Sequence, residues 1–484
     1  MTDSDDISWR KKLGALARVA RYKPKFTAVI IVIGGFTAFL EGVGLSFIWP
    51  IIEVAQAEEP ITEAGGFLGA FLTAYETLGI PFTLEFLIIG IAGVMTVRFT
   101  MSFVVDWLRA ILQKRYEEDL RTRTFNAALD AEVGYFDDEG SDNILNAIIT
   151  ETGYSGRVIK AGVSSVETLF LVLVYLSVMF YIAPLMAVVA LVLLGGITFV
   201  LRYVIEPAYT VGSRVAKANQ NVQQAVQAGT QGIRDVKLFS LTEEIFDDFR
   251  DAVRQYTTSS IDLARNKAAV QNFYDLAAAL VLFGLIYIGF VFTGLSTGAL
   301  GIFLLAMFRL SPLVSRLNSQ VYNLEGNISH LVRTQDFLDE LGMRQEGSGS
   351  QNISNANRIR FDDVRFSYNE EEEVLRGISF EMEREKFIAF VGQSGAGKST
   401  IVSLLARMYD ADDGEIRADD VPIEEYEIDE WRSRVAVVRQ NPFIFNDTLE
   451  RNVNIGKREA TREEVERVCE IAKVDEFLDD LPNG

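Results

Sequence analysis

The chain has 484 residues, 49% of them hydrophobic, and a formal net charge of −21. A single cysteine, Cys469, and a single histidine, His330, exclude an internal disulfide, a cysteine metal site and a histidine-based triad or metal site. The acidic balance, with 13 Lys among 46 basic residues, argues against nucleic acid as a partner and is typical of a halophilic proteome, although an ordinary acidic protein could also show it.

The first 25 residues are acidic and then basic, without an apolar core, so we expect no cleavable signal peptide. Beyond them, six apolar segments are long enough to cross a bilayer, which takes about 20 residues. These predicted spans are residues 26–52, 84–106, 161–183, 185–205, 268–293 and 299–322.

The basic residues between the spans predict an orientation. The connection 53–83, the turn at Pro184 and the turn 293–298 contain no Lys or Arg, whereas the remaining connections are rich in both. By the positive-inside rule we expect a multi-pass protein of the cytoplasmic membrane with both termini in the cytoplasm.

Two long connections, 107–160 and 206–267, have the composition of helices, so the spans should continue as helices beyond the bilayer. Each is interrupted once, by GYFDDEGSDNIL (134–145) and by GIRDVKLFSLTEE (232–244). The aromatic residues Tyr135, Phe136 and Phe239 lie beside charges there, which predicts contact surfaces rather than plain loops.

Four ionisable residues fall inside the spans: Glu41, Arg98, Asp275 and Arg309. Such residues are costly in lipid and usually face a partner or a cavity. Two interpretations stay open. They can form an internal ion pair, such as Glu41 with Arg309, or Arg309 can line a cavity for an anionic or amphipathic substrate.

Residues 342–356 are polar and rich in Gly and Ser, which is typical of a linker. Alternating apolar residues then predict strands over 358–368 and 375–383. The continuous apolar run FIAFVG (387–392) predicts a buried central strand.

That run leads into VGQSGAGKST (391–400), which matches the Walker A or P-loop pattern G-x-x-x-x-G-K-[ST]. Its glycines let backbone N–H groups wrap around phosphate oxygens, at the positive end of a helix starting near Lys398. Lys398 would face the terminal phosphates of ATP, and Ser399 would bind Mg²⁺. The residues that we expect to bind the nucleotide are Gly392, Ser394, Gly395, Ala396, Gly397, Lys398, Ser399 and Thr400.

Six spans followed by this motif resemble a half-transporter of the ATP-binding cassette (ABC) exporter family, over essentially the whole chain. The resemblance implies a multidomain fold: an all-α polytopic membrane domain of six transmembrane helices with long cytoplasmic extensions, then an incomplete α/β P-loop nucleotide-binding domain. On this basis residues 1–341 form the membrane domain, 342–356 the linker and 357–484 the partial cassette.

The resemblance also implies roles for single residues. Tyr368, in VRFSY, would stack on the adenine of ATP. Gln440, in VVRQNPFIF, would contact Mg²⁺ and the attacking water, as the one catalytic residue and a second metal contact. The tips near 135–137 and 237–244 resemble coupling helices, and the partner would be a second copy or a paralogous half-transporter.

The sequence departs from the family pattern in two ways. Glu385 stands where the family usually has a glycine. No LSGGQ-like signature, no apolar run ending in Asp-Glu (Walker B) and no switch histidine downstream of the P-loop are present, and the last residues, FLDDLPNG, fall just inside the family's helical subdomain. We therefore expect a truncated transporter or gene fragment that binds Mg-ATP weakly and does not hydrolyse it.

Two classes of function stay open. One is an exporter or flippase driven by ATP, and the other is a regulatory membrane protein that binds ATP without hydrolysis; an importer fits less well, because importers usually carry the cassette on a separate chain. FLEGVGLSFIWPIIE (39–53) is similar to the first span of exporters related to lipid-linked oligosaccharide flippases. It favours a lipid-like or amphipathic substrate, while multidrug and peptide export remain alternatives.

Overall fold

The computed structural model describes residues 8–57, 66–292, 297–353, 356–368, 372–474 and 476. Parts of four expectations lie outside this range: the connection 53–83 at 58–65, the turn 293–298 at 293–296, the linker at 354–355, and FLDDLPNG at 477–484. The chain forms two compact units: unit 1 holds residues 1–129 and 142–342, and unit 2 holds 130–141 and 343–484. The segment 130–141, expected in the membrane domain, thus belongs to unit 2.

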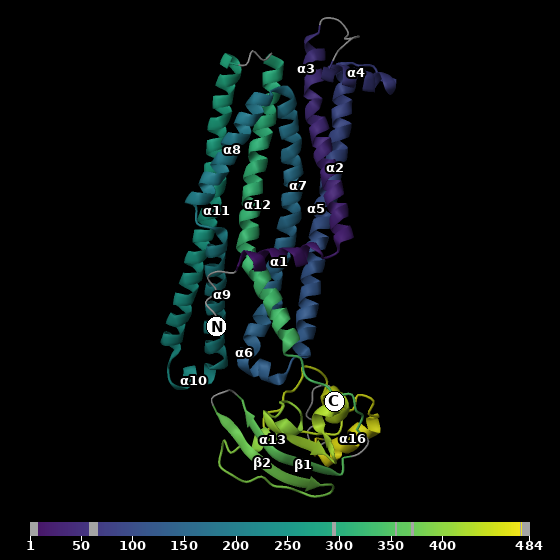
Figure 1. The fold of residues 1–484 in the computed structure, drawn as a ribbon, viewed down its shortest axis with the longest axis vertical. Helices are drawn as coiled ribbons and strands as arrows, with labels where there is room; N and C mark the ends of the chain where they lie inside the picture. The colour runs from purple at the N-terminus through teal and green to yellow at the C-terminus, as the bar shows by residue number, and fades with distance from the viewer. Residues whose placement is uncertain are drawn as a thin grey trace. The chain divides into compact units, whose positions relative to one another are not determined.

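Long helices that run alongside one another make up unit 1 (Figure 1). They are α1 (Trp9–Ala20), α2 (Pro24–Ser46), α3 (Ile48–Gln56), α4 (Gly66–Thr77), α5 (Leu84–Leu129), α7 (Thr152–Ile182), α8 (Pro184–Val204), α9 (Ala208–Gln231), α10 (Ile233–Leu238), α11 (Thr242–Phe292) and α12 (Thr297–Met343). Within the described ranges, six helical stretches are long and apolar enough to cross a membrane, one for each predicted span. Helices α5, α11 and α12 have 46, 51 and 47 residues, so they continue well beyond a bilayer.

The boundaries between these helices follow from local chemistry. Pro184 is the first residue of α8, where a missing N–H costs nothing, and Ala183 before it leaves the helical region at φ −149° and ψ 79°. The first predicted span, 26–52, is divided at Phe47 into α2 and α3. The α6 helix (Val133–Asn146), interrupted at Gly140 with φ 74°, and a π-helical turn (Ala147–Glu151) lead into α7.

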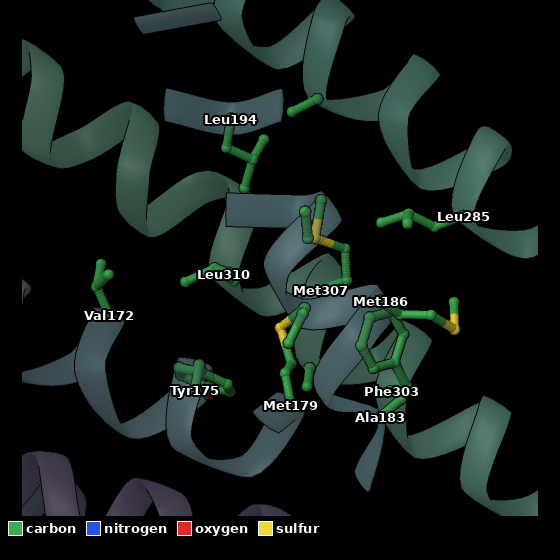
Figure 2. Close-up of a cluster of buried hydrophobic side chains, with 14 of the residues drawn as sticks. Val172, Tyr175, Met179, Ala183, Met186, Leu194, Leu285, Phe303, Met307 and Leu310 are labelled. Carbon is green, nitrogen blue, oxygen red and sulfur yellow. The ribbon is translucent and has the colours of Figure 1, made fainter. Parts of the chain in front are cut away.

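The largest buried cluster of unit 1 lies between α7, α8, α11 and α12 (Figure 2). Met179, Met186, Phe303 and Met307 are each at most 1% exposed. Small residues on α8 and α12, namely Ala187, Ala190 and Ala306, are fully buried. Because lipid tails are as apolar as these side chains, close packing around small residues is what holds such helices together.

Unit 2 is built on one antiparallel sheet. Its strands β1 (Arg358–Ser367), β2 (Glu373–Glu383), β3 (Asp413–Ala418) and β4 (Val421–Pro422) follow the order β2-β1-β3-β4. The helices are α13 (Lys398–Leu405), α14 (Ile428–Arg432), α15 (Leu449–Val453) and α16 (Arg462–Ile471), with 3₁₀ turns at Ile423–Glu425 and Asn454–Gly456. Phe361, Leu375, Leu404 and Trp431 are at most 2% exposed and form the core. Strands β1 and β2 coincide with the two alternating runs of the sequence.

The predicted buried strand over 387–392 is wrong for this structure. The segment forms no strand, and the side chains of Phe387 and Val391 are 92% and 95% exposed. A central strand must exchange hydrogen bonds with a neighbour on each side. Within the part of the chain that the structure describes, no strand is paired with this segment. Ile388 is half-buried, and the ring of Phe390 lies 5.3 Å from that of Phe380, although Phe390 is still 37% exposed.

The described part of the predicted linker is attached to unit 2. The backbone of Gln351 exchanges hydrogen bonds with Glu425 and Glu427 at 2.9 Å each. The Arg432 guanidinium donates two hydrogen bonds, of 2.8 and 2.7 Å, to the Glu346 carboxylate. Bidentate pairs of this kind hold a fixed geometry, so residues 346–351 extend the folded part of unit 2.

Candidate functional site

The phosphate-binding loop ends where α13 begins, at Lys398. Gly395 and Gly397 have φ values of 83° and 80°, a region that side chains disfavour. A Cβ at Gly397 would also come within 2.5 Å of the Leu375 side chain. Glycine at 397 is therefore required by both backbone conformation and space, and the N–H groups of the first turn of α13 stay accessible to an anion.

The polar side chains of the loop lie where phosphate chemistry needs them. The Lys398 ammonium donates to the carbonyl oxygens of Gly392 and Gln393 at 3.1 and 2.6 Å, so its charge is held inside the loop. Ser399 is exposed at the start of α13. Residues 392–396 are exposed as well. This arrangement fits a nucleotide phosphate chain, with the Ser399 hydroxyl as a ligand for Mg²⁺.

Tyr368 is brought to this loop by β1, which ends one residue before it. Its hydroxyl lies 3.1 Å from the Thr400 Oγ1, and Thr400 is only 4% exposed. The ring packs edge-on against Phe366 and Tyr409, at centroid distances of 4.8 and 5.2 Å. Tyr368 is 46% exposed, so part of the ring remains free to contact a base.

Gln440 is exposed, and in the described part of the chain it makes no hydrogen bond to the loop 392–400, so its expected role stays a prediction. The preceding segment 435–439 forms no strand, and Val438 is 98% exposed. Like 387–392, this apolar segment is paired with no strand among the described residues.

The sequence did not single out Tyr409, yet it links the loop region to the segment 130–141 within unit 2. Its hydroxyl donates to the carboxylate of Asp137, and its ring lies close to Gly134. Burial and the neighbouring Asp137 carboxylate raise the pKa of Tyr409. Through Tyr368, the ring of Tyr409 is one contact away from Thr400. In the sequence, the only sign of this role of Tyr409 would have been an aromatic residue shortly after the P-loop helix.

Backbone bonds hold the same segment. The N–H of Glu132 donates to Arg344 O at 2.8 Å, and that of Glu346 donates to Asp130 O at 3.1 Å. The Arg344 guanidinium also pairs with the Glu132 carboxylate at 2.9 Å. Residues 134–141 of the first predicted contact tip thus belong to unit 2, and residues 142–145 belong to unit 1. At the second tip, in unit 1, the apolar Leu238 and Phe239 are 74% and 65% exposed.

Among the charged residues inside the spans, the ion-pair partner of Glu41 is not the one suggested by the sequence. Glu41 pairs with Arg98 at 2.5 Å, not with Arg309, and accepts a bond of 2.7 Å from the Tyr175 hydroxyl. The side chains of Glu41 and Arg98 are 11% and 20% exposed. Glu41 lies on α2 and Arg98 on α5, two helices that pack together. Packing of the helices, which no local pattern encodes, decided the pair.

The other two charged residues inside the spans are Asp275 on α11 and Arg309 on α12. Both are exposed, and neither forms an ion pair within the described residues. An exposed, unpaired charge inside an apolar span is unfavourable against lipid, at about 2.5–3.5 kcal/mol for a residue at mid-helix. Their surroundings in the membrane must therefore supply water or an opposite charge.

Two family models match the chain: one described as the ABC transporter transmembrane region, over residues 26–311, and one described as ABC transporter, over 375–483. An uncharacterized ABC transporter ATP-binding protein (YknV) of Bacillus subtilis is 28% identical over 82% of this chain and 67% of its own length. Proteins named ATP-dependent lipid A-core flippase are similar as well. That of Nitrosococcus oceani is 28% identical over 84% of this chain and 68% of its own length. That of Chromobacterium violaceum is 26% identical over 89% and 73%.

Proposed function

Because the chain belongs to the ABC transporter family, as a multi-pass membrane protein of the exporter type, we propose that it moves a lipid-like or amphipathic substrate across the cytoplasmic membrane. The observation that carries the proposal is the loop before α13, held open by Gly395 and Gly397 in the same chain as six membrane-length helices. Both termini and the loop would face the cytoplasm, where ATP is available.

The nucleotide would be ATP with Mg²⁺. Backbone N–H groups of residues 392–397 and the first turn of α13 would surround the phosphates, Lys398 would neutralise their charge, and Tyr368 would contact the base. When bound, the nucleotide supplies the phosphate charge that draws these groups together. Thr400 is buried, and its hydroxyl is hydrogen-bonded to that of Tyr368. This bond fixes the position of the Tyr368 ring relative to the phosphate loop.

A second copy or a related half-transporter would complete the working unit. The exposed Leu238 and Phe239 on the second tip offer an apolar contact to a cassette of the partner chain. Arg309 and Asp275, exposed within spans, favour an interface or cavity over lipid. ABC exporters of the half-transporter type usually pair in this manner, which supports the same arrangement.

An acidic headgroup on the substrate follows from Arg309. Glu41 is already paired with Arg98, so Arg309 has no ion-pair partner within the described residues. A phosphate or carboxylate on an amphipathic molecule would compensate the charge of Arg309. The relatives named as lipid A-core flippases favour a lipid-like substrate over a multidrug or peptide one.

These 484 residues by themselves would bind ATP without turnover. Gln440 makes no hydrogen bond to the loop within the described residues, Phe387, Val391 and Val438 are exposed, and the sequence contains no signature or Walker B motif. Without a group that activates water, the phosphate loop can hold ATP only.

The test is nucleotide binding and hydrolysis by the purified chain in nanodiscs. We expect weak Mg-ATP binding, lost by more than about tenfold in Lys398→Ala because one charge on the terminal phosphates disappears. Lys386→Ala, an exposed lysine of the same unit, should bind as the parent does. Hydrolysis that Lys398→Ala abolishes would contradict the binding-only assignment, and binding unaffected by Lys398→Ala would contradict the site itself.

A further inference from the structure

A second site lies in unit 1, at the ends of four spans where the long helical extensions begin. A cavity of about 340 Å³ opens there between α7, α9, α11 and α12. Its lining includes Arg157, Lys267, His330, Tyr154 and Ser260. No Asp or Glu belongs to the lining. In a chain of net charge −21, a cavity lined by Arg157 and Lys267 and by no carboxylate is a local exception to the composition.

The basic groups are held in place by a stack of side chains. The rings of Tyr154 and His330 are parallel within 12°, with centroids 4.1 Å apart, and the Arg157 guanidinium lies 4.5 Å from the Tyr154 centroid. On the far side, His330 Nδ1 lies 2.7 Å from the carboxylate of Glu151. That carboxylate, also paired with Arg333, therefore anchors the stack without entering the cavity.

Two features leave the cavity ready for an anion. Arg157 and Lys267 are exposed and form no ion pair within the described part of the chain. The Ser260 hydroxyl is buried and likewise lacks a hydrogen-bond partner among the described residues, so a donor is available. The adjacent cavity, by contrast, has its charges matched, with Arg202 and Glu325 paired at 2.8 Å.

Depth in the membrane indicates where the anion comes from. Arg157 precedes the predicted span 161–183 by four residues and Lys267 precedes 268–293 by one. At 1.5 Å per residue both lie within about 6 Å of the hydrocarbon boundary. This is the layer that holds lipid headgroups, about 5–8 Å thick on each side of the bilayer.

We infer that the cavity between α7, α9, α11 and α12 binds a phosphate group, and that the phosphate is that of a lipid headgroup at the membrane surface. Arg157 and Lys267 supply the charge, Ser260 supplies a hydrogen bond, and the Tyr154–His330 stack fixes the Arg157 guanidinium. The site is separate from the ATP loop of unit 2 and does not depend on the proposed transport activity.

The test is native mass spectrometry of the purified full chain, released from detergent that contains phosphatidic acid or, as a phosphate-free control, diacylglycerol. The parent should retain phosphatidic acid and not diacylglycerol. Arg157→Gln and Lys267→Gln should each weaken retention by about fivefold to tenfold, because each removes one charge–phosphate contact. Both side chains are exposed, so folding should be unaffected.

Lys160→Gln and Lys217→Gln are the matched controls. Both lysines are exposed on α7 and α9 and lie outside the cavity lining, and each change removes the same charge. Retention that falls equally in the controls would overturn the site, since the effect would then come from net charge. Retention unchanged in Arg157→Gln and Lys267→Gln would overturn it as well.

Equilibrium dialysis with inorganic phosphate distinguishes the two sources. Phosphate bound by the lipid-free parent and lost in the Arg157→Gln, Lys267→Gln double variant would keep the site but assign it to a free phosphate. Loss of phosphatidic acid retention with no binding of inorganic phosphate would assign it to the lipid headgroup. Binding of neither would refute the proposal.

Discussion

Unit 1 and unit 2 differ in where their backbone hydrogen bonds are made. In unit 1 the polar backbone of α5, α7 or α11 is satisfied within each helix, and the side chains then pack as in the cluster around Met179 and Phe303. In unit 2 the backbone of β1 is satisfied by β2 on one side and β3 on the other. The segments 387–392 and 435–439 have no such neighbour in the described residues and remain open.

The difference shows how much structure a stretch of chain can form alone. A helix needs only its own residues for its hydrogen bonds, which is why it can cross a membrane. A strand needs another strand, which can lie far away in the sequence. Exposed apolar side chains therefore have different meanings in the two units: on unit 1 they suit lipid, whereas Phe387, Val391 and Val438 lie in segments that no described strand pairs with.

The largest expected effect compares two phenylalanines of unit 2. Phe361 is 1% exposed in the core, and Phe387 is 92% exposed. Phe361→Ala should lower the free energy of unfolding of unit 2 by about 3–5 kcal/mol, because it leaves a cavity. Phe387→Ala should cost less than about 0.5 kcal/mol, because its side chain is already in solvent. Denaturant unfolding of the full chain in detergent, followed by fluorescence of the buried Trp431, measures both.

Equal costs for the two substitutions would break the comparison. They would mean that 387–392 is covered in solution, as the sequence alone suggested. Hydrogen exchange gives an independent check, since amides of β1 should be protected while those of 387–392 exchange rapidly.

Within unit 1, breaking the ion pair of Glu41 and Arg98 should have the next largest effect. Glu41→Ala leaves the mostly buried Arg98 without its partner, which should cost about 3 kcal/mol in thermal unfolding in detergent. The change also removes the acceptor of the Tyr175 hydroxyl. Unit 1 is thus expected to depend on an internal charge pair in addition to packing.

A double-mutant cycle identifies the partner. Glu41→Ala and Arg98→Ala should show a coupling energy of about 1–3 kcal/mol, whereas Glu41→Ala and Arg309→Ala should be nearly additive. A coupling to Arg309 as large as that to Arg98 would restore the pairing first suggested by the sequence.

A smaller effect is expected at the attachment of residues 130–141 to the rest of unit 2. Tyr409→Phe removes the hydroxyl that donates to Asp137, at a cost of about 1–3 kcal/mol for a bond to a charged acceptor. Amide exchange at Glu132 and Glu346, whose N–H groups hold this segment, should accelerate. Tyr426→Phe, whose hydroxyl makes no hydrogen bond in the described part of the chain, should leave that exchange unchanged.

The same contact should depend on pH. Burial and Asp137 raise the pKa of Tyr409 above its usual value near 10, so the folded state holds the phenolic proton more tightly than the unfolded state. The stabilisation is therefore complete below about pH 10 and is lost as the pH rises further. A parent and a Tyr409→Phe variant that lose protection equally above pH 10 would contradict this assignment.

The smallest effect, and the only gain, is expected at Glu385. This residue has φ 65° in the turn after β2, a conformation that costs a non-glycine residue about 1 kcal/mol. Glu385→Gly should stabilise unit 2 by about 0.5–1 kcal/mol, and Glu385→Ala, which keeps a Cβ, should not. A gain from alanine as large as that from glycine would point to charge instead of backbone conformation. The positive φ at this position is a physical reason why the family usually has a glycine there.

The sequence by itself determined the elements that depend on near neighbours. Apolar runs of about 20 residues predicted the six spans, alternation predicted β1 and β2, and the glycine spacing placed the phosphate loop before α13. These features arise from the periodicity of helix and strand and from the backbone freedom of glycine, so a short window contains all the information they require.

Only the tertiary structure decided which residues meet. It paired Glu41 with Arg98, joined Tyr409 to Asp137, brought Tyr368 to Thr400, and left 387–392 exposed. It also assembled the basic cavity around Arg157 from four helices. Each of these outcomes depends on which residues distant in the chain meet or fail to meet, and that is set by the packing of whole helices and strands, which no local pattern of residues encodes.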